Sequence, residues 1–184
     1  MTMIPPHVVT TPGHTNNVMM SEVHEMMSEM DTMDMSGDPD THFAKMMKGH
    51  HQGAIEMAQI EIAQGTDASI KTMAQTMLNA QTQEISDLNM FLADHIPHAE
   101  NDEFNMEMEH SMMKMHNNID LQAVNGNIDH DFALLMIFHH QSAIEMADIV
   151  LHYGHEPEIA DMAQMMKEDQ EMEIEQLQNW LLGQ

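Results

Sequence analysis

The chain contains an internal duplication, and this feature constrains its fold more than any other. A gapless shift of 89 residues places the segment HHQGAIEMA at 50–58 on HHQSAIEMA at 139–147. The register holds to the end of the second copy, where Leu92 falls on Leu181. Self-similarity at a fixed period indicates that one structural unit is present twice, with apolar faces that the two copies bury together.

Each copy predicts a pair of antiparallel helices. Gly65 and Gly154 occupy equivalent positions, and glycine is the residue that most readily ends a helix. After Gly65, apolar residues recur every three or four positions, the period of a helix buried on one face; they are Ile70, Met73, Met77, Ile85, Leu88 and Leu92. The predicted helices span 41–64 and 67–94, then 129–153 and 156–182. The predicted fold class is therefore all-α, a ferritin-like four-helix bundle made of two hairpins.

We predict a single duplicated domain, residues 18–184, after a flexible tail, residues 1–17, that is rich in Pro, Thr and Asn. Repeat one covers 18–94 and repeat two covers 95–184. Each repeat begins with a Met-rich helical arm, at 18–36 and at 102–118. The link between the hairpins is long enough to cross the bundle, which makes the first helices of the two hairpins antiparallel.

Composition excludes several classes of function. Five Lys and no Arg oppose 31 Asp and Glu, and a net charge of -26 disfavours binding to nucleic acid. The absence of Cys excludes disulfides, thiolate zinc sites and iron–sulfur clusters. Sulfur is supplied by 26 Met instead, against only 10 Leu, and 15 His accompany them. This excess of thioethers is more than ordinary core filling requires.

Methionine and histidine together point to copper. Neutral thioethers favour Cu(I), with Ag(I) as a surrogate, and imidazole also accepts Cu(II). Many Met and His lie three or four residues apart, where two side chains of one helix can reach the same ion. The predicted cofactor or cargo is copper, as Cu(I) and possibly Cu(II).

The candidate ligands form two sets. Those of the bundle are Met46, Met47, His50, His51, Met57, Met136, His139, His140 and Met146. Those of the arms are Met20, His24, Met26, Met27, Met106, His110, Met112, Met113 and His116. The arm residues alternate with Glu and Ser, so little apolar surface is expected to bury them. Met73, Met77, Met162 and Met166 are instead interpreted as core.

The duplicated His pairs lie on otherwise apolar stripes and are expected to face the bundle. A crossing of the two hairpins near Gly53 and Ser142 would bring His50 toward Met146 and His139 toward Met57. The alternative is that these histidines are hydrogen-bonded core residues that lock the hairpins together. Glu56 and Glu145 are interpreted as surface groups or as groups that support a ligand.

The double occurrence of H-H-x-x-A-x-x-M-A resembles the signature of a bacterial family of helical proteins catalogued as a domain of unknown function, which includes a Met- and His-rich copper-resistance member. The resemblance covers about 40–94 and 129–182. It implies a ferritin-like bundle, copper binding and a role in copper tolerance.

The leading hypothesis is a non-enzymatic protein that sequesters or transfers copper through several exchangeable sites. One alternative is a carboxylate-bridged di-metal oxidase, for which two Glu-x-x-His motifs are expected; Glu107 and His110 supply one. The other is a Met-rich surface for partner helices. No nucleophile elbow, phosphate loop or HExxH helix supports other catalysis.

The expected partners are copper ions and a copper-delivery or efflux protein, with the oligomeric state left open. The sequence contains no run of about 18 apolar residues, so no membrane span is predicted. Residues 1–17 do not resemble a signal peptide, which taken alone implies the cytosol. Thioether sulfur, which cannot form bridges, suits an oxidising compartment, so we expect a periplasmic or secreted mature form without its leader.

Overall fold

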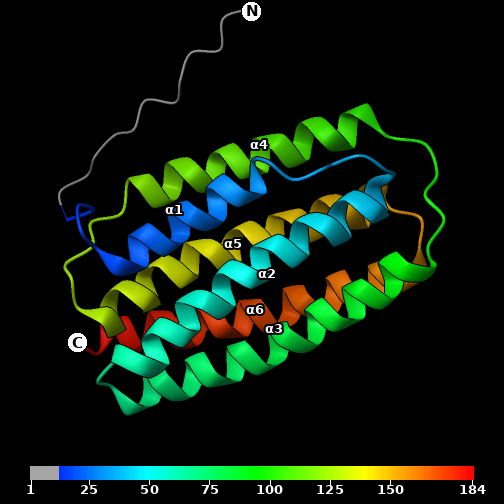
Figure 1. The fold of residues 1–184 in the computed structure, drawn as a ribbon. Helices are drawn as coiled ribbons and strands as arrows, with labels where there is room; N and C mark the ends of the chain where they lie inside the picture. Colours follow the sequence, from blue (N-terminus) through cyan, green and yellow to red (C-terminus); the bar gives the residue numbers. More distant parts are fainter. Residues whose placement is uncertain (1–12) are drawn as a thin grey trace, which may run out of the picture.

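A computed structural model describes residues 13–184, and every regular element in that range is an α-helix. The six helices are α1 (Val18–Met30), α2 (Pro39–Gln64), α3 (Ala68–Asp94), α4 (Asp102–Asp120), α5 (Ile128–Tyr153) and α6 (Pro157–Leu182). They form three layers, with α2 and α5 in the middle, α3 and α6 on one side, and α1 and α4 on the other (Figure 1). The predicted all-α bundle is confirmed.

The hairpin helices begin and end close to where the repeat predicts them. The largest difference is at α2, which begins at Pro39 rather than at 41 because the Asp38 side chain accepts a hydrogen bond from the Thr41 amide. Proline fits the first turn of a helix, where its missing N–H has no partner to lose. The Gly-Asp-Pro segment that interrupts the arm is therefore also the start signal of the next helix.

The two middle helices are antiparallel, as the long link predicts. At one end of the bundle, Asp129 in the first turn of α5 accepts hydrogen bonds from the Thr66 and Asp67 amides, just before α3. At the other end, Asp40 in the first turn of α2 accepts hydrogen bonds from the amides of His155 and Glu156, just before α6. The first helix of each hairpin thus accepts hydrogen bonds from the turn of the other hairpin.

The Met-rich arms are part of the core, so the expectation that little apolar surface buries them is wrong. Six residues of α1 are buried at helical spacing; they are Met19, Met20, Val23, Met26, Met27 and Met30. Helix α1 packs on α2 and α5, while α4 packs on α5. Gly53 makes room for α1, since a Cβ at this position would lie 2.3 Å from Met26 Sδ.

The predicted tail falls mostly on residues 1–12, which lie outside the described residues. Residues 13–17 contact the connection between α4 and α5. Gly13 has a φ of +99°, and a Cβ there would lie 2.2 Å from the Val124 carbonyl oxygen. Asn17 caps α1 and donates a hydrogen bond from Nδ2 to Asp131. This short segment is therefore held in place at the bundle end.

Candidate metal centre

Four imidazoles meet at the centre of the middle layer. His50 and His51 of α2 and His139 and His140 of α5 have no solvent-exposed surface. The rings of His50 and His139 stack with centroids 3.6 Å apart and an interplanar angle of 30°. His139 Nε2 also lies 2.8 Å from the His50 carbonyl oxygen, where it donates a hydrogen bond. The two copies of the motif thus meet at these histidines, not at Gly53 and Ser142 as the spacing hypothesis placed the crossing.

Each remaining histidine has a glutamate partner on the next helix. His51 Nε2 lies 2.9 Å from Glu84 Oε2 of α3, and His140 Nε2 lies 2.8 Å from Glu173 Oε2 of α6. Glu84 and Glu173 are equivalent in the repeat. The four helices of the bundle therefore contribute two matching His–Glu pairs.

Several buried polar atoms around these pairs have no hydrogen-bond partner within the protein. They include both ring nitrogens of His50, Nδ1 of His51, His139 and His140, and the side-chain amides of Gln81 and Gln170. Gln81 and Gln170 are also equivalent in the repeat. An unpaired buried polar group costs about 1–3 kcal/mol, so a concentration of such groups at one place calls for a functional reason.

The stacked histidines are neutral. Burial, together with repulsion between neighbouring imidazoles, holds the pKa of His50 and of His139 well below the usual value. A neutral imidazole keeps an unprotonated nitrogen and can bind a metal ion without first losing a proton.

An acidic cavity opens next to one of the His–Glu pairs. It has a volume of about 370 Å³ between α3 and α6 and is lined by Met77, Asp169 and Glu173, among others. Partial burial raises the pKa of Asp169, and the negative charges of Glu84 and Glu173 raise it further. Three carboxyl groups therefore lie close enough to interact at this entrance, an arrangement that attracts cations.

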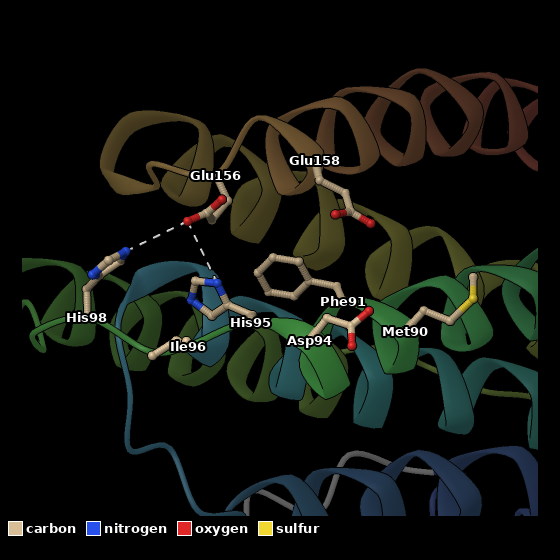
Figure 2. Close-up of a pocket in the computed structure, with 8 residues that line it drawn as sticks. All are labelled: Met90, Phe91, Asp94, His95, Ile96, His98, Glu156 and Glu158. Carbon is tan, nitrogen blue, oxygen red and sulfur yellow. Dashed lines mark ion pairs between the residues drawn. The ribbon is translucent and has the colours of Figure 1, made fainter.

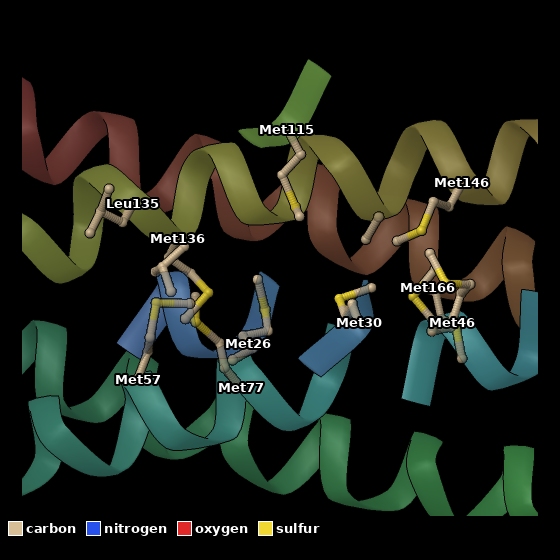
Figure 3. Packing of buried hydrophobic residues seen from close by; sticks show 14 of the residues in the cluster. Met26, Met30, Met46, Met57, Met77, Met115, Leu135, Met136, Met146 and Met166 are labelled. Carbon is tan, nitrogen blue, oxygen red and sulfur yellow. The ribbon is translucent and has the colours of Figure 1, made fainter. Parts of the chain in front are cut away.

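Methionines lie on both sides of the paired histidines along α2 and α5. In the view of Figure 3, Met57, Met77 and Met136 form one group, and Met46, Met146 and Met166 form another. Met57 and Met77 correspond to Met146 and Met166 in the repeat. All six belong to one buried apolar cluster, in agreement with the core interpretation of Met77 and Met166. Met47, the remaining methionine predicted as a bundle ligand, is also buried in this cluster.

The arm candidates do not gather at a single place. Met20, Met26, Met27 and Met112 are buried, whereas Met106, Met113 and His110 are exposed. His116 Nε2 lies 4.0 Å from Asp31, and His24 Nε2 lies 2.9 Å from Asp120. The ligand roles of the arm residues stay predictions.

A second cavity, of about 420 Å³, lies at the bundle end where α3 ends and α6 begins (Figure 2). Glu156 Oε1 lies 3.7 Å from His95 Nδ1 and 3.8 Å from His98 Nε2. His95 Nε2 is also 2.9 Å from Asp38. Because Asp38 is the N-cap of α2, these histidines serve at least to hold the link between the hairpins against the bundle.

The sequence reasoning did not assign Glu84, Glu173, Gln81 or Gln170 to the site. The repeat could have identified them. All four are polar residues that recur identically in both copies, on helices whose other repeated positions are largely apolar. A polar residue that recurs on a buried stripe of both copies indicates a shared polar centre rather than a solvent-facing group.

One helix resembles a membrane span by length and composition. Helix α5 contains an 18-residue window with a mean hydropathy of 1.2, and 56% of that window is buried inside the protein. Its central place in the middle layer accounts for its apolar composition (Figure 1). The core helix of a bundle must be apolar on several faces.

The chain matches one protein family and resembles solved structures of that family in fold. The family model described as "Domain of unknown function (DUF305)" matches residues 4–92 and 40–181. A crystal structure of a DUF305 fragment from Deinococcus radiodurans is 20% identical, with a TM-score of 0.59, and covers 79% of this chain and 97% of its own. A crystal structure of a DUF305 protein from Streptomyces coelicolor, provisionally described as secreted, is 21% identical with a TM-score of 0.62. The match covers 79% of this chain and 92% of that protein's chain. No curated protein matches.

Proposed function

Because the chain belongs to the DUF305 family, whose function is unknown, we propose a function from its own residues: it binds copper and sequesters or transfers it outside the cytoplasm. Copper is the cargo, and no reaction is part of the proposal. A contribution to copper resistance and homeostasis follows from it.

The observation that carries the proposal is the duplicated polar centre. Buried imidazole nitrogens without protein partners, three of them on the two rings held neutral, are suited to metal ligation. The glutamates beside His51 and His140 can orient the rings and increase their basicity, as carboxylates do around metal-bound histidines. Without a metal, the same centre would bury polar groups at a cost that apolar residues avoid.

The choice of copper rests on the surrounding sulfur. Met47 precedes His50 by three residues and Met57 follows His51 by six, which corresponds to about 4.5 Å and about 9 Å along a helix. Thioethers and imidazoles favour Cu(I) over harder cations. Flexible methionines close to the histidines can pass the ion from one donor set to the next, which suits a protein that stores and releases its cargo.

The cellular location is part of the proposal. Two features support a site outside the cytoplasm: the chain has no cysteine, and a DUF305 protein of the same fold is provisionally described as secreted. A closer kinship with CopM, the Met- and His-rich copper-resistance protein that the repeated motif resembles, belongs to the same proposal.

The test is a competitive titration of the metal-free protein with Cu(I) against a chelator, with Zn(II) in parallel. The critical variant is His51→Gln/His140→Gln, because glutamine keeps a polar N–H group near Glu84 and Glu173 but removes the imidazoles. His42→Gln is the matched control, since His42 is also buried but bonds to Asn105 away from the centre.

We expect the wild type and His42→Gln to retain Cu(I), and the double variant to lose about tenfold or more in affinity, a typical effect for a perturbed metal site. Failure of the wild type to retain Cu(I), or equal binding by the double variant, would overturn the proposal. Circular dichroism confirms that each variant is folded.

A di-metal oxidase is a second candidate because each hairpin supplies one His–Glu pair to the centre. The predicted Glu107-x-x-His110 motif does not contribute to this centre, since both residues are exposed on α4. Loading with Fe(II) followed by measurement of O₂ consumption separates the two functions: rapid consumption by the wild type but not by His51→Gln/His140→Gln would favour the oxidase.

A further inference from the structure

A separate cluster of metal-ligating side chains lies at the end of the outer layer. His14 precedes α1, His24 is in α1, and Asp120 is the last residue of α4. Each offers one ligand atom, and these atoms all lie within 4.8 Å of one another. All three side chains are partly exposed, so an ion from solvent can reach them without opening the core.

The spacing of these atoms fits a bound ion. His24 Nε2 and Asp120 Oδ1 are 2.9 Å apart. Two ligands at about 2.0–2.1 Å from one ion are separated by about 2.8–3.4 Å when their angle at the metal lies between square and tetrahedral values. This pair can therefore accept an ion between them with little movement, and the ligand atom of His14 lies within 4.8 Å of both.

His14 is held near the cluster by contacts other than the proposed metal. Its Nε2 lies 2.7 Å from the Gln122 carbonyl oxygen, which accepts the N–H. That hydrogen bond leaves Nδ1 as the unprotonated nitrogen of the neutral ring, the arrangement in which a histidine can bind a metal through its other nitrogen. The close approach of Gly13 to Val124 fixes the same segment.

We propose that His14, His24 and Asp120 form a surface site for a divalent metal ion of the borderline class, best filled by Cu(II). Two imidazoles and a carboxylate suit Cu(II) and Zn(II), and Cu(II) is the tighter binder of the two at a given nitrogen and oxygen site. The bound ion joins the segment before α1, α1 itself and the end of α4. This site does not depend on the buried centre, which favours Cu(I).

The test is electron paramagnetic resonance of the full chain with one equivalent of Cu(II), in the presence of glycine as a weak competitor. The critical variants are His14→Ala and His24→Ala. The matched control is His152→Ala, which removes another solvent-exposed histidine from α5. Thermal unfolding is measured with and without Cu(II), because an ion that joins three segments of the folded chain stabilises it.

In the wild type and in His152→Ala we expect nitrogen hyperfine structure from two imidazoles and a rise in the melting temperature with Cu(II). Each critical variant should lose one nitrogen from the spectrum, about tenfold or more in affinity, and most of the thermal shift. Identical spectra and affinities in His14→Ala, His24→Ala and the wild type would overturn the assignment. Cu(I) titration of the same variants shows whether the buried centre fails independently.

Discussion

The two copies of the repeat match closely around the central histidines but differ in the layer formed by α1 and α4. In the middle, the two copies agree in detail, since the His51–Glu84 and His140–Glu173 distances are 2.9 and 2.8 Å. In the layer of α1 and α4, α1 packs on both middle helices, whereas α4 packs mainly on α5 and contacts α2 through His42. The histidines of the two arms also differ, because His24 lies beside Asp120 while His110 is exposed.

The difference follows from what each residue faces. A residue at the contact between the copies faces its own counterpart, as His50 faces His139, so a change in one copy alters the surroundings of both. Solvent-facing residues of α1 and α4, such as His110, do not face their own counterpart and can diverge separately. The duplication is therefore preserved where the copies meet and is lost where each copy contacts solvent.

The largest effect is expected at the centre itself. His50→Ala and His139→Ala each remove a fully buried ring and leave a cavity, at a cost of about 2–4 kcal/mol in the free energy of unfolding. Because the two positions are equivalent, the two losses should be similar. His110→Ala in the exposed part of α4 should change stability by less than about 0.5 kcal/mol. Urea unfolding measures all three, and a large loss in only one of the central variants would contradict the equivalence.

A second difference between the copies lies at the ends of the middle helices. Glu61 is buried beside Asp129 at the end of α2, whereas the equivalent position of α5 is Val150. Burial raises the pKa of Glu61 to about 8, and the negative charge of Asp129 raises it as well. Asp129 itself is partly buried, but hydrogen bonds from Asp67 and Thr66 hold its pKa below the usual value. Glu61 is therefore the carboxyl group of the two that keeps its proton to higher pH.

This pair makes stability fall as pH rises. Between the ordinary glutamate value near pH 4.5 and about pH 8, the folded chain keeps a proton on Glu61 that the unfolded chain releases, so the free energy of unfolding decreases through that window. Glu61→Gln mimics the protonated side chain and should lower the drop in melting temperature from pH 5 to pH 8.5 by several degrees. Glu175→Gln makes the same charge change on the surface. An equal pH dependence in the two variants would show that net charge, not Glu61, sets the slope.

Much of the fold could be predicted from the repeat alone. A polar motif that recurs with flanking apolar periodicity fixes four helices, their turns and their antiparallel arrangement. The arms were harder to place, although Met19, Met20, Val23, Met26 and Met27 already follow helical spacing. Their burial depends on α2 and α5 presenting a second apolar face, with Gly53 leaving space for Met26. The apolar periodicity of one helix does not show how many apolar faces the neighbouring helices have available for packing.

The candidate site could be predicted only in part. The duplicated histidines mark the centre in the sequence, but the partners of His51 and His140 lie on other helices, and their identification requires the register of each hairpin. The cluster of His14, His24 and Asp120 is harder still, because its residues come from three segments far apart in the chain. Contacts of this kind depend on tertiary packing, which spacing rules do not describe.

A smaller effect tests whether the two His–Glu pairs are functionally equal. Glu84→Gln and Glu173→Gln keep the shape of the side chain but remove the carboxylate charge beside each imidazole. Each change should weaken Cu(I) binding by about tenfold, the usual size of such an effect around a metal-bound histidine. Glu145→Gln, which affects a partly exposed glutamate bonded to Lys114, is the control. Chelator competition measures the affinities. If only one pair mattered, the centre would be symmetric in structure but not in function.

The smallest effect on stability, and the one that best separates the layers, concerns methionine. Met26→Leu and Met112→Leu conserve volume at buried positions and should cost less than about 1.5 kcal/mol. Met113→Leu, at a side chain 58% exposed, should have almost no effect on stability. Leucine cannot ligate copper, so loss of Cu(I) capacity in Met113→Leu without loss of stability would identify the exposed arm methionines as ligands. Unchanged copper binding in all three variants would mean that none of these three methionines is a ligand, because removal of a ligand must reduce binding whether or not the side chain is buried.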